Sequence, residues 1–115
     1  MAIELEQFQF VLLRTPDGAP DYDDETARRI QREHLAFYAA LRESGQVVTN
    51  GPFREQPDET LRGLAVYAVG SLEEARELAG SDPAVQAGRL EVEAMTWLCP
   101  PGGLTRRGTP VIIEN

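Results

Sequence analysis

The order of two hydrophobic periodicities along the chain constrains its fold more than any other feature. Residues 7–14, QFQFVLLR, alternate and then become continuously apolar, as a β-strand does. Residues 24–44 repeat apolar side chains at helical spacing, from Ala27 and Ile30 to Leu41. Further strand-like runs follow at residues 46–53, 61–69 and 89–98, and a helical run lies at residues 71–80. The predicted order is therefore β-α-β-β-α-β.

Local end signals support both helices. Asp23 or Asp24 suits the N-cap of the first helix, and Gly45 suits its left-handed C-cap. Ser71 and Glu74 have the spacing of a capping box at the start of the second helix.

This order is the split-βαβ, or ferredoxin-like, arrangement, an α+β fold with a four-stranded antiparallel sheet and both helices on one face. The segment 61–69 is apolar on both faces, which predicts a central strand, while Gly51 and Pro52 are expected to break the second strand. An open apolar sheet face needs a cover, so we expect a homodimer, in a dimeric α/β-barrel-like assembly.

The chain has the length of one domain. We expect residues 1–98 to form that domain. Residues 99–115 form a C-terminal extension, with a β-prone tail at 109–115 as an extra strand or a dimer contact.

Charge and composition exclude several functions. The net charge of −8 disfavours nucleic acid and anionic membrane surfaces as partners. All 11 basic residues are Arg, so no lysine is present for a Schiff base, pyridoxal phosphate or a P-loop. One His and one Cys cannot supply the usual zinc ligands, and no G-x-G-x-x-G motif occurs. We therefore expect no cofactor and no metal.

Location is predicted from what the sequence lacks. The first ten residues have no basic region before an apolar run, and no apolar run reaches the roughly 20 residues that span a bilayer. The single Cys99 permits no internal disulfide, and its place before two prolines predicts a spectator thiol in a loop. These features favour a soluble, cytoplasmic protein.

His34 is the only histidine, and its spacing places it on the inward face of the first helix, between Ile30 and Phe37. An imidazole can act as a general acid or base near neutral pH. It can also be a core histidine bonded to a backbone carbonyl. Spacing alone favours the core histidine and leaves the pocket residue as the alternative.

Asp82 stands before Pro83, which is typical of a capping residue at a helix start. A carboxylate that caps a helix can still offer its second oxygen to a neighbour. In this fold the two helices lie side by side, so a contact between Asp82 and His34 is allowed. Such a contact would select the tautomer of the imidazole ring.

The segment Asn50-Gly51-Pro52 is a candidate pocket element. A Gly-Pro break exposes backbone groups and lets a ligand approach closely, and Asn50 adds a neutral donor and acceptor. The same residues could simply form a turn or bulge.

Several motifs in this order resemble the YciI-like (YCII-related) family and the related DGPF-type proteins. The motifs are H-x-x-F-x-x-x-L-x-x-x-G from His34 to Gly45, GPF at 51–53, S-x-E-E-A at 71–75, and DPAVQAG followed by LEVEAMTW. The resemblance covers roughly residues 7–98. It implies a dimeric α+β fold similar to muconolactone isomerase, and an active site built from His34 and Asp82.

Two functions from different classes follow. The resemblance favours a small cofactor-independent lyase or isomerase, in which His34 and Asp82 act as an acid–base pair on a hydroxylated aromatic or lactone-like substrate. The alternative is a non-catalytic dimeric module that binds a small ligand or has a regulatory role. Haem binding through His34 is a third interpretation.

Overall fold

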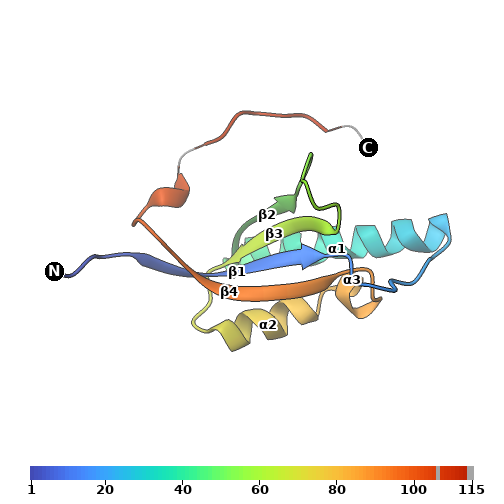
Figure 1. The fold of residues 1–115 in the computed structure, drawn as a ribbon, viewed down its shortest axis with the longest axis horizontal. Helices are drawn as coiled ribbons and strands as arrows, with labels where there is room; N and C mark the ends of the chain where they lie inside the picture. Colours follow the sequence, from blue (N-terminus) through green and yellow to red (C-terminus); the bar gives the residue numbers. More distant parts are fainter. Residues whose placement is uncertain (106, 114–115) are drawn as a thin grey trace.

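The structure is a computed structural model that describes residues 1–105 and 107–113. Its elements are β1 (Glu6–Arg14), α1 (Asp24–Ser44), β2 (Val47–Pro52), β3 (Leu61–Tyr67), α2 (Leu72–Gly80), α3 (Pro83–Gln86), β4 (Glu91–Cys99) and a 3-10 turn at Gly103–Thr105. The strands form one antiparallel sheet in the order β2-β3-β1-β4 (Figure 1). The predicted α+β fold with a four-stranded antiparallel sheet is therefore confirmed, and β3 is a central strand.

Helix α1 has the bounds that its local signals predict. The Asp23 carboxylate accepts a hydrogen bond from the backbone N–H of Thr26, which satisfies one of the free donors of the first turn. Gly45 ends the helix with φ of 85°, a conformation that suits a residue without Cβ. Between these ends, the apolar side of the helix faces the sheet, and Ile30, Tyr38 and Leu41 are buried.

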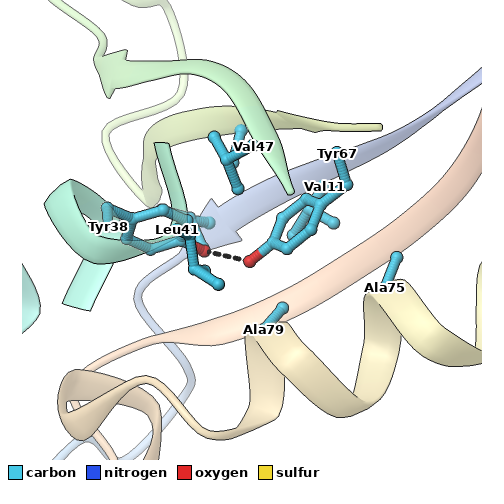
Figure 2. Close-up of a cluster of buried hydrophobic side chains, with 9 residues drawn as sticks. Val11, Tyr38, Leu41, Val47, Tyr67, Ala75 and Ala79 are labelled. Carbon is cyan, nitrogen blue, oxygen red and sulfur yellow. Dashed lines mark hydrogen bonds between the residues drawn. The ribbon is translucent and has the colours of Figure 1, made fainter. Parts of the chain in front are cut away.

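The core lies between the helices and one face of the sheet (Figure 2). Val11 of β1 and Ala65 of β3 belong to it, and small alanines of α2 allow that helix to lie close to the sheet. Tyr38 and Tyr67 are fully buried in this core, and their hydroxyl oxygens lie 2.8 Å apart. Each phenol oxygen thus has a hydrogen-bond partner, as buried tyrosines require.

Among the described residues, no helix lies on the opposite face of the sheet. Trp97 of β4 packs against Phe8 and Phe10 of β1, with ring centroids 6.3 and 6.2 Å apart. Strand pairing adds Met95 beside Phe10 on the same face. We call the following residues the open face: Phe8, Phe10, Leu12, Leu64, Val66, Met95 and Trp97.

Two sequence predictions are wrong. Gly51 and Pro52 do not break the second strand; they pair with Leu64 and Gly63 as the last residues of β2. Because β2 is an edge strand, the missing N–H of a proline costs no ladder hydrogen bond on its solvent side. Cys99 is not a loop residue; it ends β4 and is buried.

In Figure 1 the N-terminal segment projects beyond the start of β1, and the red segment after the 3-10 turn arches above the sheet. Residues 109–113 contain no helix or strand within this single chain, and residues 114–115 lie outside the described residues. The role of the tail as an extra strand or a dimer contact stays a prediction. Val111, Ile112 and Ile113 are exposed. In the part of the chain that the structure describes, no helix has the length and apolarity needed to cross a membrane.

Candidate active site

A cavity of about 400 Å³ opens at the end of the sheet where β2 stops and β3 begins. Its walls come from the loop after β1, one side of α1, and the segment that joins α3 to β4. The volume is within the range of pockets that hold small organic molecules. Tyr22 closes one wall, because its hydroxyl donates a 2.8 Å hydrogen bond to the carbonyl of Ala87 and so ties the loop to the turn after α3.

His34 lines this cavity and touches Asp82. Its Nδ1 lies 2.7 Å from Oδ2 of Asp82. The imidazole side chain is 12% exposed and the carboxylate is 0% exposed. The contact that the sequence allows is therefore present, with the ring between a buried carboxylate and an open cavity.

Asp82 is held rigidly because it also caps α3. Its Oδ1 accepts a 2.9 Å hydrogen bond from the backbone N–H of Ala84, while Oδ2 is the oxygen that faces His34. Pro83 fits the first helical position, since it has no N–H to satisfy there. The local Asp-Pro sequence thus explains the cap, and the packing of α3 against α1 supplies the second contact.

The contact with Asp82 favours one tautomer of the imidazole ring. An ionised carboxylate only accepts hydrogen bonds, so it selects the tautomer with the proton on Nδ1. The lone pair is then on Nε2, which has no hydrogen-bond partner among residues 1–105 and 107–113. Such a nitrogen can accept a proton from a molecule in the cavity.

Tyr38 follows His34 by one helical turn and supports the imidazole from the core side. Their ring centroids are 5.3 Å apart in an edge-on arrangement. Burial, together with the charge and hydrogen bond of Tyr67, raises the pKa of the Tyr38 phenol well above its usual range. Burial also raises the pKa of Tyr67 to about 12. Both phenols therefore stay neutral near pH 7 and add no charge beside the site.

The predicted pocket residues Asn50, Gly51 and Pro52 all line the cavity. Oδ1 of Asn50 accepts a hydrogen bond from the guanidinium of Arg42, and its NH2 group has no hydrogen-bond partner among residues 1–105 and 107–113. Gly63 makes this wall possible, because a Cβ at that position would lie 2.5 Å from the carbonyl oxygen of Gly51.

Two arginines are among the cavity residues that the sequence did not predict. Arg62 comes from the start of β3, and Arg89 follows α3. The strand register pairs Pro52 with Gly63, which places Arg62 beside the predicted pocket segment. Pairing the second and third strands in the sequence could have found Arg62. Nothing in the sequence singles out Arg89.

Solved structures with the same fold include two small-molecule enzymes. One is 5-chloro-2-hydroxyhydroquinone dehydrochlorinase from Burkholderia phenoliruptrix AC1100, in complex with 2,5-dihydroxybenzoquinone. It has 18% sequence identity and a TM-score of 0.53, and the match covers 77% of this chain and 92% of that chain. The other is muconolactone isomerase, with 14% identity and a TM-score of 0.60, covering 89% of this chain and 99% of that chain. At these identities the likeness shows the α+β fold alone.

The family is shown by the sequence itself. Residues 9–98 match the YCII-related domain, so this chain belongs to that family. The match reaches into all four strands and includes His34 and Asp82. No curated protein matches the chain significantly.

Proposed function

We propose that this protein is a cofactor-independent enzyme of the lyase or isomerase type. It would act on a small hydroxylated aromatic or lactone-like molecule bound in the cavity. The observation that carries the proposal is the 2.7 Å contact of His34 with a fully buried Asp82, made by a ring that also lines a cavity of about 400 Å³.

The proposed chemistry is a proton transfer at Nε2 of His34. Nε2 takes a proton from an acidic C–H or O–H group of the substrate, and the electron pair moves onto a conjugated carbonyl oxygen. The imidazolium then returns the proton to another carbon, which gives an isomer, or the electron pair expels a leaving group, which gives an elimination. Asp82 is the positioning residue, since it holds the ring and stabilises the imidazolium.

The oxyanion that forms needs hydrogen-bond donors. The NH2 group of Asn50 and the backbone beside Gly51 line the cavity and are suited to this role. The names of the two structural neighbours also support the proposal, because one is a dehydrochlorinase and the other is an isomerase.

Deuterium exchange tests the proposal even when the product is not identified. Candidate phenols and lactones are incubated with the protein in D2O, and incorporation at carbon is followed by mass spectrometry. His34→Gln keeps an amide that can bond Asp82 but removes the base, so we expect the rate to fall by about 10²-fold or more. Equal rates in the wild type and in His34→Gln would contradict the proposal, and binding without exchange would favour the non-catalytic module.

We also propose that the open face is covered by a second copy of the chain. Its aromatic and aliphatic residues come from three strands and lie on one side of the sheet. Burying such a surface is favourable by about 25 cal/mol per Å². The exposed residues Val111, Ile112 and Ile113 would add a contact from the tail.

Sedimentation of two matched variants tests this assembly. Met95 is 40% exposed on the open face, whereas Leu98 is 53% exposed on the other face of the same strand. We expect Met95→Glu to give a monomer and Leu98→Glu to sediment like the wild type. A monomeric wild type at micromolar concentration would refute the homodimer.

A further inference from the structure

Two arginines line the cavity together with His34. Arg62 comes from β3 and Arg89 from the segment after α3, so the two belong to separate elements. Asp21 also lines the cavity, and the carboxylate of Asp82 lies behind His34. In a chain whose net charge is −8, the two arginines are the groups of this cavity that can bind an anion.

The backbone holds both arginines in place. The carbonyl of Arg62 accepts a 2.9 Å hydrogen bond from the N–H of Phe53, across the β2–β3 pair. The N–H of Arg89 donates a 2.9 Å hydrogen bond to the carbonyl of Ala84, in the turn that also carries Asp82. The turn that positions the carboxylate of the proton-transfer pair thus also positions the backbone of Arg89.

Both guanidinium groups are available to a ligand. Within the described ranges, 1–105 and 107–113, neither has an ion pair or a side-chain hydrogen bond. Arg14, by contrast, contacts Asp58 and Glu93 at 2.9 and 3.0 Å. Other arginines on the surface are also unpaired, so the inference depends on two unpaired arginines that line one cavity with the histidine.

We propose that the substrate carries a carboxylate and that Arg62 and Arg89 bind it. This inference rests on the proposed function and names the substrate class: a small hydroxylated aromatic or lactone-like acid. The planar guanidinium matches a carboxylate with two parallel hydrogen bonds. An acid anchored by this pair is confined in one cavity with Nε2 of His34, which orients the molecule for proton transfer.

A phosphate fits the cavity less well than a carboxylate. Phosphate sites commonly use the free N–H groups of a helix N-terminus. Here the nearest helix starts are capped by the chain's own carboxylates, since Asp23 binds Thr26 of α1 and Asp82 binds Ala84 of α3. Side-chain guanidinium groups remain as the anion donors.

Calorimetry with matched probes tests the proposal. The probes are 2,5-dihydroxybenzoate, its methyl ester and phenyl phosphate, titrated into the wild type at low ionic strength. We expect the acid to bind at least about tenfold more tightly than the ester and than phenyl phosphate. Arg62→Gln and Arg89→Gln should each weaken acid binding about tenfold and leave ester binding unchanged, while the control Arg76→Gln, on the exposed surface of α2, should change neither.

The result separates this inference from the proposed function. Three results would overturn the carboxylate site. The first is no binding of the acid, and the second is equal affinity for acid and ester. The third is a preference for the acid that survives in the double Arg62→Gln, Arg89→Gln variant. Tighter binding of phenyl phosphate would overturn it in favour of a phosphate ligand. In that case deuterium exchange on neutral phenols could still support the proposed chemistry. If the arginines bind the acid but no compound exchanges deuterium, the proposed function fails and the carboxylate site stands.

Discussion

Helix α1 carries two polar side chains one turn apart, and their surroundings differ completely. His34 pairs with Asp82 at 2.7 Å and lines a cavity, whereas Tyr38 pairs with Tyr67 at 2.8 Å and is fully buried (Figure 2). In the tyrosine pair, each hydroxyl has the other as its hydrogen-bond partner. In the histidine pair, one ring nitrogen is satisfied and the other is left to the cavity.

The comparison shows how the same helix serves structure and chemistry. A polar pair that is closed on all sides contributes to stability and specificity of the core. A polar pair with one atom left open can exchange protons with a ligand. We therefore expect substitutions in the histidine pair to change proton transfer more than stability, and substitutions in the tyrosine pair to do the reverse.

The largest expected effect comes from Asp82→Asn. The amide oxygen can still cap Ala84, but the amide NH2 then donates to Nδ1 of His34 and moves the ring proton to Nε2. A ring with its proton on Nε2 cannot act as a base toward the cavity, so deuterium exchange should fall by about 10²-fold or more. Nitrogen-15 NMR of the single histidine reports the tautomer directly.

The matched control for this experiment is Asp23→Asn. It alters a carboxylate cap of the same kind at the start of α1, without the contact to the histidine. We expect the tautomer and the exchange rate to match the wild type. An unchanged tautomer in Asp82→Asn would mean that the carboxylate does not position the ring.

A smaller effect is expected on the stability of the closed pair. Tyr67→Phe leaves the buried hydroxyl of Tyr38 without its partner, which should lower the free energy of unfolding by about 1–3 kcal/mol. The double variant with Tyr38→Phe removes both polar groups and should recover most of that loss. Urea unfolding measures the stability of the single and the double variant. In both variants, the rate of deuterium exchange should stay within about twofold of the wild type. If the double variant loses as much free energy of unfolding as the two single variants together, the phenols do not act as a pair.

The last expected effect is confined to alkaline pH. Burial raises the pKa of Tyr67 to about 12 and that of Tyr38 further, from an ordinary value of 10.0. The folded state therefore holds these protons more tightly than the unfolded state. The contribution of Tyr67 is complete below pH 10.0 and is lost as pH rises through 12, and the contribution of Tyr38 is lost over the same range and above it.

Unfolding of the wild type and the double phenylalanine variant from pH 8 to pH 12 tests this dependence. The wild type should lose stability more steeply above pH 10.0 than the variant. Parallel curves would show that the phenols ionise as easily in the folded state as in the unfolded state.

Much of the fold could be predicted because its signals are local. The bounds of α1 follow from Asp23 and Gly45, which act on the residues next to them in the chain. The cap by Asp82 is local in the same way. The inward position of His34 follows from helical spacing, whichever element packs against that helix.

The errors arise where the effect of a residue depends on its neighbours in space. The Gly51-Pro52 pattern predicts a break in β2, but on an edge strand a proline removes no pairing on the solvent side. The two prolines after Cys99 predict a loop, but pairing with Glu6 extends β4 to include that residue.

The sequence by itself determined the order of the elements, the caps, and the presence of one histidine and one Asp-Pro helix start, because these depend on residues near one another in the chain. Only the tertiary structure decided that the histidine meets the carboxylate 48 positions away, and that two arginines from different elements line the same cavity. Those distances depend on how α1 and α3 pack and on the register of β2 with β3, which are set by the sum of many contacts rather than by any local pattern.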